Sequence, residues 1–244
     1  KFTGEESDSG TKEINLKIKK GKNKAYFGDV NVGYGTDEKY QANANLFQLI
    51  DGKQLGVIMG TNNINMSRGF NSLPDADSSN GYIESDFIGA NFSKGKWDET
   101  RVNANYKYSS QNNDRAQKSY TENFLPNLNY ITNSESSGFN DSDRHDVGSD
   151  LKFLIKPKNK TSKNNVQLSN VTNFNTSNND SFSTVTKASE YANGDAVSNY
   201  FSRSNAFSSN YALNNNFSVT SRVGKKQDYF NIGLSTSFDK QDGN

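Results

Sequence analysis

Apolar and polar residues alternate with a period of two along most of this chain, and this alternation limits the fold more than any other feature. A β-strand places alternate residues on opposite faces. In the segment KAYFGDVNVGYGT (24–36) the two alternate sets are Tyr26, Gly28, Val30, Val32, Tyr34 and Phe27, Asp29, Asn31, Gly33, Gly35. The segment therefore predicts a strand with one aromatic and aliphatic face and one mostly small or polar face.

The same alternation recurs in nine segments, and helical periodicity is almost absent. The expected strands are 24–35, 39–50, 53–64, 82–94, 98–110, 143–156, 164–177, 199–223 and 228–240. We therefore predict an all-β chain whose strands form an antiparallel meander.

The chain has few hydrophobic residues for an ordinary globular core. They make up 31% of its 244 residues, whereas soluble domains carry about 45–50%. Disordered chains tolerate such a composition, but an aromatic content of 12% with regular alternation argues against disorder. Transmembrane barrels also tolerate it, because their apolar residues face lipid while the lumen stays polar.

Charge and residue usage exclude several classes of protein. The formal net charge is +1, with both signs spread along the chain, so there is no electrostatic case for nucleic-acid binding. The absence of cysteine excludes disulfides and thiolate metal sites. No apolar run approaches the roughly 18–20 residues of a membrane helix.

The predicted connections fall into two classes that alternate along the chain. The short, basic connections are 51–53, 95–97, 156–163 and 224–227, and the long, Ser/Asn/Asp-rich ones are 62–81, 111–142 and 179–200. The connection 36–38 is short where a long one is expected. Outer-membrane barrels have short periplasmic turns and longer extracellular loops, so this asymmetry favours a transmembrane barrel over a half-buried soluble sheet.

On this interpretation, one alternate set of each strand faces lipid. The residues predicted to face lipid are Tyr26, Val30, Val32, Tyr34, Val102, Tyr106, Leu151, Phe153, Phe217, Val219, Phe230, Ile232 and Leu234. Trp97 fits an interfacial girdle or an aromatic that packs on a turn.

Nine strands are an odd number, whereas bacterial single-chain barrels use an even number. A sheet with bare edges in lipid leaves backbone groups unsatisfied at several kcal/mol each. We therefore expect an incomplete barrel, about nine strands of a larger one, that belongs to a longer polypeptide or is held open by another protein.

Candidate chemical sites are few. His145 is the single histidine, and a solvated loop end explains its setting better than a metal site. The stretch 75–86 resembles a calcium loop through Asp75, Asp77 and Asp86, but it lacks the usual glycine and glutamate. A solvated loop is favoured there too. No nucleophile, base and orienting acid come together, so we expect no enzyme activity, cofactor or bound metal.

Three stretches resemble a known family. They are GTKEINLKIKKGKNKAYFGDVNVGYGTDEKYQANANLF with the following DGKQLGVIMGTNNIN, SYTENFLP (119–126), and RHDVGSDLKFLI (144–155). Together they resemble the plug-to-barrel junction and first barrel strands of TonB-dependent receptors from Bacteroidota outer membranes. The resemblance implies that residues 1–23 are the end of a plug domain and its linker, and that 24–244 are the N-terminal part of a large plugged barrel.

The resemblance also implies a function and partners. Such receptors import a nutrient (a glycan, peptide or metal chelate) across the outer membrane with TonB and a surface lipoprotein as partners. Two alternatives stay open: an unfinished barrel captured as a folding client of the barrel-assembly machinery, and a soluble or surface-attached Asn/Ser-rich β-adhesin.

Overall fold

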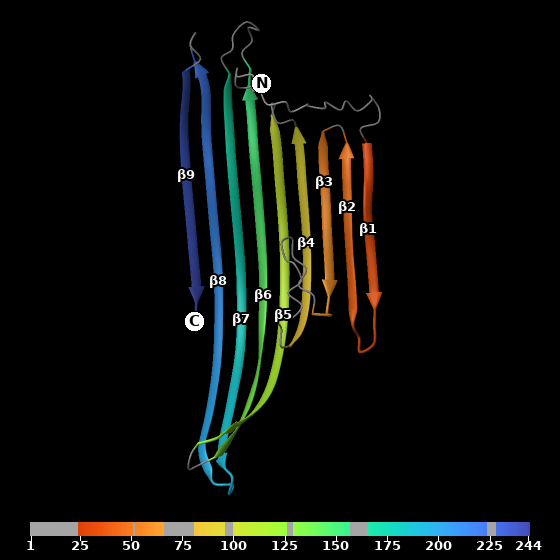
Figure 1. Cartoon of the computed structure of the whole chain (residues 1–244). Coiled ribbons are helices and arrows are strands. Elements are labelled where there is room, and N and C mark those ends of the chain that lie inside the picture. The colour runs from red at the N-terminus through yellow and green to blue at the C-terminus, as the bar shows by residue number, and fades with distance from the viewer. Residues whose placement is uncertain are drawn as a thin grey trace, which may run out of the picture.

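The computed structural model is a single antiparallel sheet of nine strands (Figure 1). The structure describes residues 24–50, 52–65, 81–95, 100–125, 129–156, 165–223 and 228–244. Within these ranges, no helix has the length and apolar character needed to cross a membrane. The predicted plug end and linker (1–23) and Trp97 lie outside the described residues.

The strands follow one another across the sheet in chain order, so every connection joins neighbours. They are β1 (Lys24–Tyr34), β2 (Tyr40–Ile50), β3 (Lys53–Asn62), β4 (Tyr82–Gly95), β5 (Arg101–Asn123), β6 (Tyr130–Ile155), β7 (Val166–Tyr191), β8 (Ala196–Val223) and β9 (Asp228–Gly243). The prediction of an all-β antiparallel meander from these nine segments is confirmed. The sheet is open, with β1 and β9 as its two edges.

Strands β5 to β8 are longer than expected, and the predicted long loops 111–142 and 179–200 are wrong. The β5–β6 ladder continues to the Asn123–Tyr130 pair, and β7 and β8 continue to Tyr191 and Ala196. In Figure 1 these four strands project beyond the others and curve at their far end. Cross-strand hydroxyl pairs such as Ser137–Thr184 (2.9 Å) connect the extensions. Pairing context therefore outweighs the low average β-propensity of Ser, Asn and Asp.

The β1–β2 connection is a tight turn, as its short sequence predicts. Asp37 and Glu38 have φ values of 55° and 56°, and the Lys39 amide donates to the Thr36 carbonyl at 3.2 Å. Two central residues with positive φ match the right-handed twist of a hairpin. We call the end of the sheet with this turn the distal end, and the end with the β2–β3 turn the proximal end.

The sheet has almost no core of its own. Among the described residues, the buried hydrophobic side chains are Ile83 and Ala212. Large apolar side chains such as Val32 and Tyr34 are 78% and 79% exposed. Since no second layer covers them within the described ranges, the backbone ladders supply the cohesion of the described sheet.

Candidate membrane-facing surface

The strand register places most of the large apolar residues on one face of the sheet, while a smaller group that includes the stacked Phe27–Phe47 pair lies on the other face. Residues that pair directly across successive strands form what we call a register row. One such row joins Val30, Ala44, Met59, Ile88 and Tyr108. Because directly paired residues share a face, these side chains all lie on the same side, which we call the apolar face.

A second row extends this face to the other edge of the sheet. It joins Tyr106, Val147, Phe174, Leu213 and Phe238. Following the pairs in this way puts every residue predicted to face lipid on the apolar face: Tyr26, Val30, Val32, Tyr34, Val102, Tyr106, Leu151, Phe153, Phe217, Val219, Phe230, Ile232 and Leu234. The sequence alternation therefore identified one continuous surface.

The large apolar side chains of this face form a band that crosses the sheet obliquely. On β1 the band runs from Tyr26 to Tyr34, and on β9 from Phe230 to Phe238. We call this band the apolar belt. Each edge segment is nine residues long, which matches the roughly 9–11 residues of a transmembrane strand.

The belt is staggered between the two edges. Its centre on β9 is Leu234, and the register row of Leu234 passes through Phe217, Asn170, Leu151, Val102, Lys94, Lys53 and Ile50 to Lys24. Its centre on β1 is Val30, six residues beyond Lys24 along the strand. The belt therefore shifts by six residues over eight strand intervals.

This stagger defines a tilt of the strands relative to the belt. Six residues correspond to about 20 Å along a strand and eight intervals to about 38 Å across the sheet, so the strands tilt by about 27° from the belt normal. A nine-residue segment at this tilt spans about 24 Å, close to the roughly 25 Å apolar band of outer-membrane barrels. The tilt is below their usual range of about 35–45°.

Charged residues mark both edges of the belt. On the proximal side, Lys24, Lys53 and Lys94 share one register row across β1, β3 and β4. On the distal side, Asp86 and Asp143 share a row next to Tyr108. Lysine stems can cover apolar surface while their ammonium groups stay in water, so both edges suit a boundary between hydrocarbon and water.

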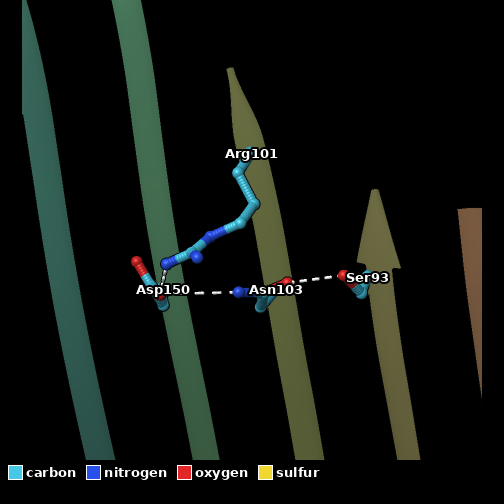
Figure 2. A network of polar contacts seen from close by, with 4 residues as sticks. All are labelled: Ser93, Arg101, Asn103 and Asp150. Carbon is cyan, nitrogen blue, oxygen red and sulfur yellow. Dashed lines mark hydrogen bonds and ion pairs between the residues drawn. The ribbon is translucent and has the colours of Figure 1, made fainter. Parts of the chain in front are cut away.

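The opposite face, which we call the polar face, carries side chains that bond to one another. Figure 2 shows a network on β4, β5 and β6 in which Arg101 pairs with Asp150. Asn103 donates from Nδ2 to Oδ2 of Asp150 at 3.4 Å, and Ser93 donates from Oγ to Oδ1 of Asn103 at 2.7 Å. The network gives this face a continuous row of satisfied polar groups.

The same pattern continues on β1 and β2. Asn45 donates from Nδ2 to both carboxylate oxygens of Asp29, at 3.1 and 3.0 Å. Asn31 donates to Asp29 and to Asn43, each at 3.1 Å. Amides and carboxylates arranged in this way satisfy each other without a dry core and suit a hydrated surface.

Of the three carboxylates of the possible calcium loop, the structure describes only Asp86. Asp75 and Asp77 lie outside the described residues. Asp86 lies within β4 and pairs with Thr61 and Ser110. The prediction that the solvated loop continues to this residue is therefore wrong. Among the residues that the structure describes, no three His, Cys, Asp or Glu side chains gather in a possible metal site.

His145 is not at a loop end, and that expectation is wrong. It lies within β6 on the apolar face, where Nδ1 is 2.9 Å from the Tyr106 hydroxyl and the ring centroid is 4.8 Å from that of Tyr108. Asp143 Oδ2 is 4.0 Å from Nε2. The histidine therefore belongs to the aromatic rim on the distal side of the belt.

A polar cluster at the distal end, centred on Asn63, was not predicted from the sequence. This buried side chain accepts a hydrogen bond from the Tyr40 amide at 2.7 Å and donates to the Glu38 carbonyl at 2.9 Å and the Tyr82 hydroxyl at 2.7 Å. Desolvation, followed by the hydrogen bond to Glu84, raises the pKa of Tyr82. The doubled Asn-Asn at 62–63 is the sequence signal that could have drawn attention to it.

Neither a protein-family model nor a curated protein matches the sequence.

Proposed function

We propose that this chain forms part of the wall of a bacterial outer-membrane β-barrel, in a TonB-dependent receptor-like importer of a nutrient such as a glycan, peptide or metal chelate. The observation that carries the membrane part of the proposal is the apolar belt. It extends over nine strands, is nine residues wide at both edges and is staggered as tilted strands require. On β7 and β8 it includes a hydrogen-bonded polar patch of Asn170, Thr172 and Asn215. The importer part rests on the resemblance of the plug-to-barrel junction and of residues 119–126 and 144–155.

Energetics also favour lipid over water against this face. Side chains such as Val30, Ile232 and Leu234 are 66%, 55% and 61% exposed. Apolar surface in water costs about 25 cal/mol per Å², and monomeric soluble proteins rarely expose patches of more than a few hundred Å². A hydrocarbon environment removes this cost without any protein core.

The polar face suits a lumen. Its asparagines, serines and ion pairs are hydrogen-bonded to one another across strands, as in the Arg101–Asp150 network of Figure 2. Such a face tolerates water or a polar plug. In this proposal TonB and a surface lipoprotein act as partners, and neither a cofactor nor an enzymatic step is required.

The open edges support a second candidate, a folding client of the barrel-assembly machinery. Strands β1 and β9 each pair with one neighbour only in the described sheet. In lipid, a bare strand edge costs several kcal/mol per unsatisfied group. An assembly factor that pairs with these edges would remove that cost during insertion.

Fractionation of expressing cells tests the membrane part of the proposal. The protein should be in the outer-membrane fraction and require detergent for release, and a soluble or surface-attached adhesin would be released by high salt. Crosslinking at β1 and β9 separates the two barrel candidates. A mature importer gives crosslinks within its own barrel, and a folding client gives crosslinks to the assembly machinery that disappear with time after synthesis.

A further inference from the structure

The distal extensions of β5 to β8 carry an aromatic cluster on the apolar face, separate from the belt. The rings of Phe139 and Phe182 are stacked, with centroids 5.9 Å apart and an interplanar angle of 29°. The guanidinium carbon of Arg203 lies 5.1 Å from the centroid of the Phe182 ring. We call these three side chains the aromatic platform.

Polar side chains flank the platform within the same register row. This row joins Asp114, Phe139, Phe182 and Asn205 across β5 to β8. It therefore spans three strand intervals, or about 14 Å. Two rings with a carboxylate on one side and an amide on the other offer both an apolar stacking surface and hydrogen-bonding groups.

This combination fits a carbohydrate. The C–H faces of a sugar ring stack on aromatic rings, whose faces carry partial negative charge. The sugar hydroxyls both donate and accept, so Asp114 and Asn205 can bind them at the two ends of the row. An open sheet surface suits an extended oligosaccharide better than a compact ligand, which needs an enclosed pocket.

The height of the platform indicates where such a carbohydrate comes from. Phe139 lies eight residues beyond Val147, the last belt residue on β6. This is about 26 Å along the strand, or about 23 Å along the belt normal at a tilt of about 27°. The headgroup layer of a phospholipid bilayer extends only about 5–8 Å beyond the hydrocarbon on each side. A phospholipid headgroup therefore stops well short of the platform, while an oligosaccharide carried on a membrane lipid can reach it.

We propose that the aromatic platform binds the oligosaccharide of glycolipids in the outer leaflet that surrounds the barrel. This inference rests on the proposed function, because only a membrane at the belt places the platform beside outer-leaflet sugars. The platform and the belt lie on the same face of β6 and β7, so one lipid molecule can contact the belt with its chains and the platform with its sugars.

The test compares binding of the full chain, in detergent, to three probes. These are a bacterial lipopolysaccharide with its core oligosaccharide, the same lipid reduced to its lipid A part, and the free core oligosaccharide. We expect the intact lipid to bind about tenfold more tightly than either part. Equal affinity for intact lipid and lipid A would overturn the proposal. If the free oligosaccharide binds as tightly as the intact lipid, the claim that the bound sugar belongs to a membrane lipid is refuted.

Variants connect this preference to the platform. The double substitution F139A/F182A should abolish the preference for the intact lipid. Tyr200→Ala removes an exposed aromatic from the opposite face of β8 and should leave the preference unchanged. R203Q keeps both rings and should weaken the preference only partly, which covers the case in which the double variant fails to fold. A double variant that folds and retains the preference contradicts the proposal.

Flotation with phosphatidylcholine vesicles separates this inference from the proposed function. A chain that floats with the vesicles but shows no preference for the intact glycolipid refutes the platform alone. A chain that does not float refutes the membrane assignment, and the platform proposal fails with it.

Discussion

The stagger of the apolar belt makes a quantitative prediction about arginine substitutions at two nearly aligned positions. The register row of Phe238 ends on β1 at Gly28, only two residues from Val30. A belt perpendicular to the strands would place Val30 and Phe238 at nearly the same membrane depth. The staggered belt places Val30 at its centre and Phe238 at its distal edge.

The expected costs differ accordingly. An arginine on the lipid face costs about 2–4 kcal/mol at the bilayer midplane and about 0–1 near the interface. Val30→Arg should therefore reduce the free energy of unfolding by about 2–4 kcal/mol, and Phe238→Arg by at most about 1 kcal/mol. Leu234→Arg should match Val30→Arg, although the two positions are six register rows apart.

Denaturant unfolding in phosphatidylcholine vesicles, followed by far-ultraviolet circular dichroism, measures these costs. Ser235→Arg on the polar face is the matched control for Leu234→Arg and should cost only about 1 kcal/mol, because it removes the hydrogen bond from Ser235 to Asn216. Val30 and Phe238 are 66% and 58% exposed in the sheet, so a soluble protein would tolerate both arginines within about 0.5 kcal/mol. Equal effects at the two positions would refute the stagger, and negligible effects at all three belt positions would refute the membrane assignment.

Three further predictions concern the polar groups. Asn63→Ala removes three hydrogen bonds and should lower the free energy of unfolding by about 2–3 kcal/mol. Hydrogen exchange at the Tyr40 amide should become faster, and unchanged exchange would show that the cluster does not hold the distal end. Asp150→Ala should cost about 1–2 kcal/mol because it removes the charge-assisted bond of Arg101. Glu135→Ala, the control, breaks the exposed ion pair with Lys118 and should cost less than about 0.5 kcal/mol. If Asp150→Ala and Glu135→Ala lose the same free energy of unfolding, the Figure 2 network does not stabilise the sheet as described. Desolvation and the Glu84 bond raise the pKa of Tyr82 above 10.0. The unfolded chain then loses the Tyr82 proton first, so the stability that this tyrosine contributes is fully present below pH 10 and is lost as pH rises through its pKa in the folded protein. The difference between the absorbance titrations of wild type and Tyr82→Phe should show a midpoint above 10. A midpoint at or below 10 would contradict the assigned environment.

The strands and their faces could be predicted from the sequence because residue alternation has a direct physical cause. Val30 and Val32 alternate with Asn31 and Gly33, and a strand has no other way to separate them. The same reasoning placed the predicted lipid-facing residues on one face before any pairing was known. What remained hidden was the register between strands, and with it the stagger of the belt.

The long extensions and the distal cluster could not be predicted, for a different reason. Residues 111–123 and 179–191 are rich in Ser, Asn and Asp, which favour turns when considered alone. Their strand conformation depends on partners distant in sequence, such as Thr132 with Ser189 at 2.9 Å. Asn63 likewise acquires its role only when the β1–β2 turn, β2 and β4 come together beside the end of β3.

The proposed function requires that the apolar belt faces hydrocarbon while the opposite face of the same strands faces water. The chain has no cysteine, so single-cysteine variants can be spin-labelled without background at Val30, Asn31, Leu234 and Ser235 in vesicles. Electron paramagnetic resonance then measures label accessibility to oxygen, which partitions into lipid, and to a water-soluble nickel chelate. We expect high oxygen accessibility at Val30 and Leu234 and high nickel accessibility at Asn31 and Ser235. Equal accessibility of neighbouring positions to both reagents would show that the belt does not face hydrocarbon.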